Sequence, residues 1–122
     1  MRPKVGLGVL IFNEKNQFLL GKRLNAHGAS SWGPPGGHLE FGESFEDCAI
    51  RETFEETFLK VDNPVFIAVT NDIFEEKNIH YVSIFMRVDL KSEQKVINKE
   101  PDKLDEWTWF SLENLPENLF LI

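Results

Sequence analysis

The sequence predicts one mixed α/β domain of the α+β type, and three observations support this prediction. Apolar segments of strand length recur along the chain, residues 44–59 have the pattern of one long amphipathic helix, and no linker rich in Gly, Pro or Ser divides the sequence. The chain has 122 residues, the length of one compact domain. We therefore expect a single domain over residues 1–122.

The first part of the chain predicts a hairpin followed by a loop. Residues 5–12 alternate apolar side chains with glycine, which is typical of a strand. The turn residues at 13–16 lead to a second expected strand at 18–22. Residues 24–37 are rich in Gly, Ser, Pro and Asn, so we expect a long loop there.

The predicted helix begins at Ser44, whose side chain can cap it, with Asp47 at the capping-box spacing. The chain breaks after the helix at Asp62-Asn63-Pro64. The elements expected beyond this break are a strand at 65–70, a polar turn at 75–78, a strand at 80–88, a charged loop at 91–103, a strand at 107–110, and a short helix at 111–115 that ends at Pro116.

The composition excludes some classes of function. The chain carries 20 acidic and 13 basic residues, for a formal charge of −7. Such a surface repels long nucleic acid, although cations bound at a site can still attract a small phosphorylated ligand. No apolar run approaches the roughly 20 residues of a membrane span. The single Cys48 excludes an internal disulfide and is typical of the reducing cytoplasm, where we expect this protein to act on a small molecule.

Three glutamates share one face of the predicted helix. At about 100° per residue, Glu52, Glu55 and Glu56 fall within a sector of roughly 100°. Carboxylates at this spacing repel one another by about 0.2–0.5 kcal/mol per pair, and Arg51 relieves only part of this cost. A solvated acidic face is the simplest interpretation, but small and apolar residues flank the glutamates. We therefore expect the glutamates to line a cleft and to bind Mg²⁺, which prefers oxygen ligands and bridges phosphates.

A pair of glycines precedes this helix at a distinctive distance. Gly36 and Gly37 allow the backbone to approach a ligand closely, although, taken alone, a plain tight turn is the favoured explanation of the pair. Five residues separate Gly37 from Glu43, and seven more separate Glu43 from Arg51. This spacing connects the glycines to the acidic helix.

Residues 37–59 resemble the Nudix box, whose pattern is G-x5-E-x7-R-E-U-x-E-E-x-G-U, where U is a bulky aliphatic residue. Every charged position of the pattern is matched, and flanking segments such as residues 20–23 and 115–116 are also similar to the family. Two positions depart from the pattern: Thr53 stands at an aliphatic position, and Phe58 replaces the glycine that ends the helix. Because Phe58 lacks the conformational freedom of glycine, we expect the helix to end differently here.

The resemblance implies a fold, a cofactor and an assembly. The implied fold is a Nudix-type α/β/α sandwich with a mixed β-sheet, and the implied cofactor is Mg²⁺, with Mn²⁺ as a substitute. Glu52 and Glu56 would be the main metal ligands, joined by Glu55 and by the carbonyl of Gly37. A homodimer is also consistent with the family.

The resemblance assigns catalytic roles as well. Glu43 would orient a water at the metal or an arginine, and Arg51 would hold the glutamates in place. The first candidate for the general base is Glu52, and the alternatives outside the box are Glu100 and Glu106.

Four residues are candidates for substrate binding. Arg23, at the end of the second expected strand, could reach the phosphates, with a solvated charge as an equal alternative. The backbone of Gly36 could approach the substrate, and Ser83 belongs to a strand expected to face the cleft. Phe120 offers a stacking surface for a base, as do Trp107 and the second tryptophan of the last strand, although burial in the core is the simpler role for these aromatic residues.

Within the family, residues 36–44 and 51–56 resemble the MutT-like nucleoside triphosphate diphosphatases. The primary prediction is therefore hydrolysis of (deoxy)nucleoside triphosphates, including modified purine nucleotides, to a monophosphate and pyrophosphate. The alternatives are a nucleotide-sugar or dinucleotide pyrophosphatase, and a non-catalytic Nudix module that senses a nucleotide. The complete set of box glutamates argues against the sensing module.

Overall fold

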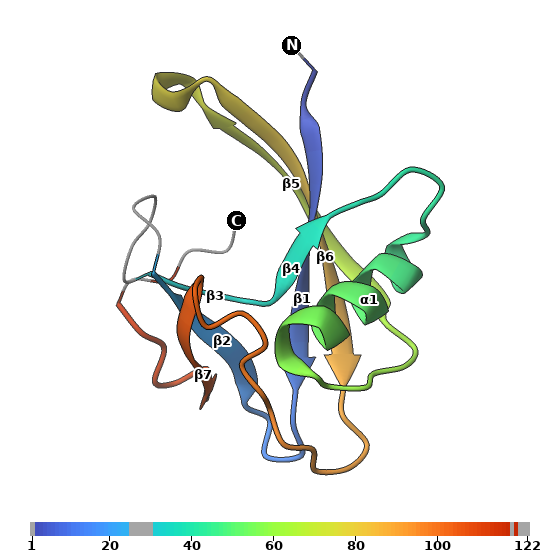
Figure 1. Cartoon of the computed structure of the whole chain (residues 1–122), viewed down its shortest axis with the longest axis vertical. Helices are drawn as coiled ribbons and strands as arrows, with labels where there is room; N and C mark the ends of the chain where they lie inside the picture. The colour runs from blue at the N-terminus through green and yellow to red at the C-terminus, as the bar shows by residue number, and fades with distance from the viewer. Residues whose placement is uncertain (1, 25–30, 118, 120–122) are drawn as a thin grey trace.

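The computed structural model describes residues 2–24, 31–117 and 119, and its sheet is built around two parallel strands. β1 (Lys4–Phe12) lies beside β6 (Ile79–Asp89) in parallel register along its whole length. β5 (Val65–Phe74) pairs antiparallel with the other side of β6, and β4 (Gly36–His38) pairs antiparallel with β1 (Figure 1). The short helical turn η1 (Glu75–Lys77) joins β5 to β6.

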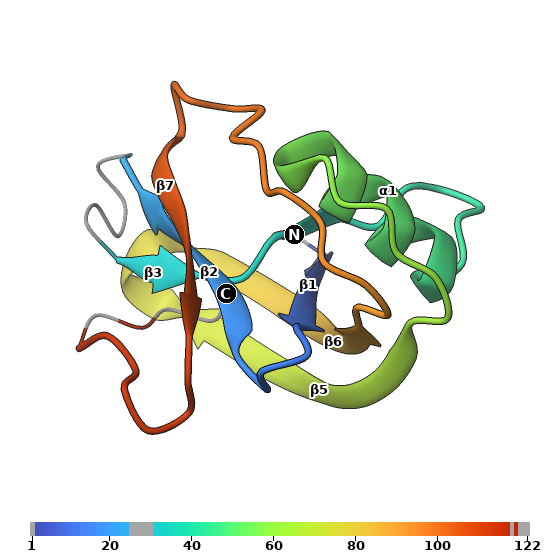
Figure 2. The same cartoon turned by 90° about the horizontal axis from the view of Figure 1, so that it is seen from below.

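A second group of strands stands beside this sheet. β2 (Phe18–Arg23) pairs antiparallel with both β3 (Trp32–Gly33) and β7 (Leu104–Phe110). One hairpin pair, Phe12 with Phe18, links β2 to β1. Figure 2 shows these three strands together, at an angle to the β1 and β6 pair. The mixed sheet and the helix described next confirm the predicted α+β class.

The helix α1 (Phe45–Thr57) covers one face of the β1 and β6 pair. As predicted, the Ser44 side chain caps it by accepting a hydrogen bond from the Asp47 N–H at 3.0 Å. Its buried positions, Cys48, Ala49, Thr53 and Thr57, face the sheet, and the first two join a core that includes Leu7, Val9, Ile11, Ile84 and Met86. In the described residues α1 is the single α-helix, so the helical layer stands on one face of the sheet.

Two local expectations were wrong. Residues 24–37 were expected to be one loop, but β3 lies within this range and β4 begins in it; residues 25–30 are outside the described part of the chain. Both strands exist because β2 and β1 offer them backbone partners, a contact that local sequence does not reveal. The helix expected at 111–115 is a turn, closed by the Asn114 N–H donating to the Ser111 carbonyl at 3.1 Å.

The end of α1 also differs from the expectation. Phe58 itself adopts the left-handed conformation, with φ 65° and ψ 10°, and its N–H donates to the Phe54 carbonyl at 3.0 Å. The Phe54 and Phe58 rings lie 4.9 Å apart, and the Lys99 ammonium lies 4.9 Å from the centre of the Phe58 ring. These contacts hold Phe58 where the family pattern has glycine, so the helix keeps a left-handed cap.

This cap predicts different stabilities for two small replacements of Phe58. Both Phe58→Gly and Phe58→Ala lose the ring contacts, but only glycine is also relieved of the left-handed strain, which costs about 1–2 kcal/mol in other residues. We expect Phe58→Gly to be more stable than Phe58→Ala by about 1 kcal/mol in urea unfolding. Equal stabilities of the two variants would contradict the assigned strain.

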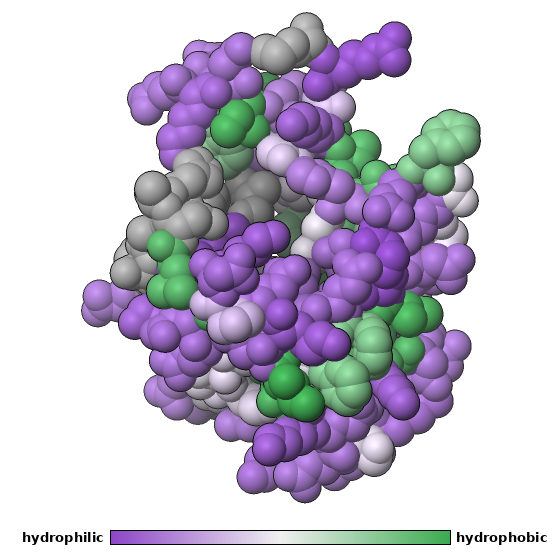
Figure 3. All heavy atoms as spheres, in the orientation of Figure 1, coloured by the Kyte–Doolittle hydropathy of each residue, from purple (hydrophilic) through white to green (hydrophobic). Residues whose placement is uncertain are grey.

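The surface of the molecule is largely hydrophilic on the face drawn in Figure 3. There, hydrophilic residues dominate and apolar residues appear in separate patches. Among the described residues, no helix combines the length and the apolar character that crossing a membrane requires.

Candidate active site

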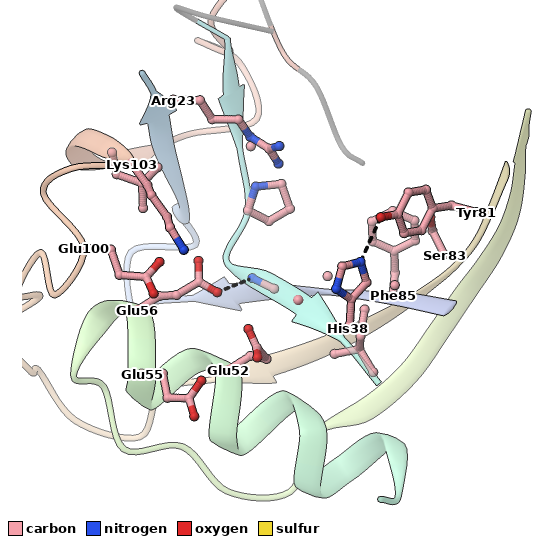
Figure 4. Close-up of a pocket in the computed structure, with 18 of the residues that line it drawn as sticks. Arg23, His38, Glu52, Glu55, Glu56, Tyr81, Ser83, Phe85, Glu100 and Lys103 are labelled. Atoms are coloured by element: carbon pink, nitrogen blue, oxygen red, sulfur yellow. Dashed lines mark hydrogen bonds between the residues drawn. The ribbon is translucent and has the colours of Figure 1, made fainter. Parts of the chain in front are cut away.

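A pocket of about 570 Å³ collects most of the residues that the sequence singled out. Its lining comes from α1, from the strands β1, β4 and β6, and from β2, β7 and the loop before β7. The lining includes seven of the predicted site residues: Arg23, Gly36, Gly37, Glu52, Glu55, Glu56 and Ser83. Residues far apart in sequence therefore meet around one cavity (Figure 4).

Arg51 stands behind the glutamates and joins them to Glu43. Its Nε and Nη2 donate to the two carboxylate oxygens of Glu43 at 2.7 and 3.0 Å, which is a bidentate pair. Its Nη1 donates to Glu52 at 2.5 Å and to Glu55 at 3.2 Å. The hydrogen bond from Arg51 lowers the pKa of Glu43 to about 2. Neither Arg51 nor Glu43 lines the pocket, so both are placed to position the glutamates.

The lowered pKa of Glu43 predicts an acid-sensitive contribution to stability. Its folded pKa of about 2 lies below the ordinary 4.5, so the ionised carboxylate stabilises the fold fully above pH 4.5 and loses this effect as the pH falls toward 2. In Glu43→Gln this part of the acid dependence should disappear from urea unfolding curves. The exposed Glu46→Gln is the control, and an acid dependence in Glu43→Gln as steep as in wild type would contradict the pairing.

Glu56 and Glu52 are neighbouring carboxylates in a place that disfavours negative charge. Glu56 accepts a hydrogen bond from the Gly36 N–H at 3.0 Å. Burial nevertheless raises the pKa of Glu56 to about 9, and the charge of Glu52 adds to this increase. Burial also raises the pKa of Glu52, against the effect of Arg51. Carboxylates that are costly to ionise side by side gain from a bound cation, which restores the charged form.

The backbone of β4 lies directly against these acids. A Cβ on Gly37 would collide with the Glu52 carboxylate, and a Cβ on Gly36 would collide with the Leu7 carbonyl. Glycine at position 37 therefore lets the backbone lie against the Glu52 carboxylate, and glycine at position 36 lets β4 lie close to β1. Carboxylate and backbone carbonyl oxygens are the ligands that Mg²⁺ and Mn²⁺ prefer, so the chemistry of this donor set fits a hard divalent cation.

The glutamates do not yet converge on one point. In the part of the chain that the structure describes, no three carboxylate, imidazole or thiol groups are gathered closely enough to hold a metal ion. In the metal-free structure Glu52 accepts a hydrogen bond from Arg51, and Glu56 accepts one from the Gly36 N–H.

Two cations also line the pocket. Arg23 comes from the end of β2, and Lys103 comes from the turn before β7 (Figure 4). Burial lowers the pKa of Arg23, and the nearby negative charge of Glu56 opposes this effect. The Leu24 N–H donates to the Lys103 carbonyl at 2.9 Å, which fastens this turn to β2. Sequence reasoning missed Lys103, because one lysine in a charged loop carries no local signal.

Besides the acidic and basic groups, the pocket has an aromatic region. The Tyr81 and Phe85 rings lie over the floor formed by Gly6 and Gly8, where added Cβ atoms would contact them. Ser83, between these two residues on β6, is 4% exposed, and its hydroxyl has no hydrogen-bond partner among the described residues. Phe85 was missed, although the period-two alternation of a strand would have placed it beside Ser83.

The His38 ring stacks on Tyr81, with the ring centres 5.6 Å apart, and its Nε2 is 2.8 Å from the Tyr81 hydroxyl. This pair forms the wall of the pocket beside β4 (Figure 4).

Of the two alternative bases, Glu100 lines the pocket, whereas Glu106 is exposed and accepts a hydrogen bond from Thr108. Trp107 lines the pocket, while Phe120 lies outside the described residues.

The chain was compared with known protein families and structures. The family model described as NUDIX domain matches residues 2–121. A solved structure of a MutT NUDIX hydrolase from Burkholderia pseudomallei is 29% identical, with a TM-score of 0.90, and the match covers 98% of this chain and 92% of that one.

Two further structures are similar. A MutT protein from Methanosarcina mazei Go1 is 27% identical, with a TM-score of 0.76, over 92% of this chain and 80% of that one. The NUDIX domain of Shewanella oneidensis NrtR, solved with ADP ribose, is 18% identical, with a TM-score of 0.78, over 93% of this chain and 75% of that one. At this identity the NrtR domain shows the shared fold alone.

Proposed function

We propose a reaction for this chain from one premise: the chain belongs to the Nudix hydrolase family. We infer that it hydrolyses a diphosphate linkage in a nucleotide and requires Mg²⁺, for which Mn²⁺ can substitute. One observation carries this proposal. The half-buried pair Glu52 and Glu56 lies against the glycine backbone of β4, in one pocket with Arg23 and Lys103. Acidic groups suited to a metal ion and basic groups suited to phosphate thus line one pocket.

The metal ligands would be Glu52 and Glu56, with Glu55 and the carbonyl of Gly37 as further donors. Such a cation, when bound, neutralises the charge of a diphosphate and favours attack by water. Glu55 has a side chain that is 52% exposed, so it would serve from the solvent side of the site.

The remaining acidic and basic residues have supporting roles. Arg51 would fix the direction of Glu52, and Glu43 would fix Arg51 through its bidentate pair. Glu52 stays the first candidate for the base that takes the proton of the attacking water, and Glu100 is the second because it lines the pocket close enough to influence the pKa of Glu56.

The substrate that we propose is a (deoxy)nucleoside triphosphate, including modified purine nucleotides, cleaved to a monophosphate and pyrophosphate. Arg23, Lys103 and the backbone of Gly36 would hold the phosphates. The recess of Tyr81, Phe85 and the Ser83 hydroxyl would receive the base. The similarity to MutT proteins over nearly the whole chain supports this choice.

A second candidate is a dinucleotide or nucleotide-sugar pyrophosphatase. One observation favours it: the pocket continues past Tyr81 to Phe74 and Ile79, at the end of the β5 and β6 hairpin. This extension offers apolar surface for a second moiety beyond the base recess.

Turnover of a substrate panel with Mg²⁺ tests the proposal. The panel contains ordinary and oxidised nucleoside triphosphates, nucleotide sugars and dinucleotides, and the products are separated by ion-exchange chromatography. We expect triphosphates to yield a monophosphate and pyrophosphate. Preferred cleavage of a dinucleotide or nucleotide sugar would select the second candidate, and no turnover of any nucleotide would contradict the proposed function.

The same assay tests Lys103. Loss of one charged hydrogen bond to a phosphate costs about 1.5 kcal/mol, so Lys103→Met should raise KM about tenfold with a smaller change in kcat. Lys95→Met, an exposed change in the same loop, is the matched control. If the two variants have the same KM, Lys103 does not contact the substrate.

A further inference from the structure

Strand β5 exposes apolar side chains along most of its length. All residues from Val65 to Asn71 are exposed in the structure. The large apolar side chains among the exposed residues of this strand are Val65, Phe66, Ile67, Val69 and Ile73. Single apolar residues on a surface are ordinary, but a contiguous row of them is typical of an interaction surface.

The outer backbone edge of β5 also has no partner strand among the described residues. In the described part of the chain β5 is the last strand of its sheet and pairs with β6 alone, and Figure 2 shows it at the outer margin. Natural edge strands are usually short or protected by Pro, Lys or other charges. β5 has 10 residues, contains neither Pro nor Lys, and has one irregularity, a register shift between Phe66 and Ala68.

The apolar side chains point to both sides of the sheet. Phe66 and Val69 pair with Met86 and Ile84 of β6, which lie in the core beneath α1, so they are on the helical side. Val65 pairs with Arg87, which places it on the opposite side. A partner strand added to this edge would extend the sheet, and its side chains would cover part of the apolar residues on each of the two faces. A partner that covered one face alone would leave the other row exposed.

The charges on β5 allow a copy of the same strand as its partner. Residues 65–71 carry no charge, so this run can lie opposite a copy of itself without bringing like charges together. Near the start of the strand, Arg87 and Lys91 are each paired with an aspartate of this chain, so this end is close to neutral. The far end carries Asp72, Glu75 and Glu76. Antiparallel pairing of two copies keeps the two acidic ends apart, whereas parallel pairing would bring them together.

We propose that β5 pairs antiparallel with β5 of a second copy of this chain, about a two-fold axis, so that the two sheets continue across a homodimer. Identical edges satisfy this arrangement because each strand offers the other the same row of free N–H and C=O groups. The proposal is independent of the reaction proposed above.

The test is sedimentation velocity at about 50 μM protein, above the micromolar Kd expected of an interface of modest size. Wild type is compared with Val69→Lys, which places a charge opposite its copy near the centre of the pairing. Leu112→Lys is the matched control, because Leu112 is 59% exposed, similar to Val69 at 54%, and lies in the turn after β7. Circular dichroism establishes that each variant is folded, and Ile73→Lys replaces Val69→Lys if the latter is not.

We expect wild type and Leu112→Lys to sediment as dimers and the β5 variant to sediment as a monomer. Hydrogen exchange should show protected amides in residues 65–74 of wild type that become unprotected in the β5 variant. A monomeric wild type, which would leave β5 to another segment or partner, overturns the proposal. So does a dimer that survives in the β5 variant, or one that Leu112→Lys disrupts equally.

Discussion

Glu56→Gln should lower kcat about a thousandfold while leaving the metal-free protein at least as stable as wild type. Glutamine keeps the shape of the side chain and can still accept the hydrogen bond of the Gly36 N–H, but it removes the charge that would hold a cation. Turnover is measured with saturating Mg²⁺ on the preferred substrate. Glu46→Gln, an exposed change in the first turn of the same helix, should keep wild-type activity.

The stability of Glu56→Gln should also depend on pH differently from the stability of wild type. The folded pKa of Glu56, about 9, lies above its ordinary value of 4.5. The metal-free fold therefore holds this proton more tightly than the unfolded chain, so the associated stability is complete below pH 4.5 and is lost as the pH rises toward 9. Glu56→Gln should lack this decline in thermal unfolding. A variant that is less stable than wild type at pH 8 without metal would contradict the assigned cost of the buried charge.

Arg51→Met should be the most destabilising of the proposed substitutions. It leaves Glu43 and Glu52, whose side chains are only 12% and 13% exposed, beside Glu55 without a compensating charge. Removing one partner of a buried pair costs about 3–5 kcal/mol, and the 25% exposure of Arg51 reduces our expectation to about 2–3 kcal/mol, or roughly 10 °C in Tm. Thermal unfolding at neutral pH measures this loss.

Arg51→Lys is the informative companion to this variant. Lysine keeps the positive charge but cannot form the bidentate pair with Glu43 while also reaching Glu52. We expect its stability to lie between those of wild type and Arg51→Met. If Arg51→Met unfolds within about 0.5 kcal/mol of wild type, the arginine network does not hold the site together.

The parts of the site that were predictable from sequence are those that depend on local spacing. The Ser44 and Asp47 cap and the face shared by Glu52 and Glu56 follow from helical periodicity, because each is complete within a few turns of one helix. Pairing between distant segments was not predictable in this way. Gly36 pairs with Gly8 of β1, a contact that exists only once the sheet has formed.

The end of α1 illustrates the same limit. Without glycine at position 58, local preference argues against a left-handed residue. The loop after β6 reverses this preference, since the Ile97 N–H donates to the Thr57 carbonyl at 2.9 Å and the Lys99 N–H donates to the Glu56 carbonyl at 3.3 Å. A segment about forty residues away thus satisfies the last turn of the helix, and the same loop brings Glu100 and Lys103 to the pocket.

A titration with Mn²⁺, monitored by electron paramagnetic resonance, measures whether the glutamates of α1 hold a divalent cation. No substrate is added. Wild type, Glu56→Gln and the control Glu46→Gln are titrated under the same conditions, so the result does not depend on knowing the substrate. We predict equal affinity for wild type and Glu46→Gln, and at least about tenfold weaker binding by Glu56→Gln. Binding by Glu56→Gln that is as tight as in wild type would contradict the placement of the metal at Glu52 and Glu56.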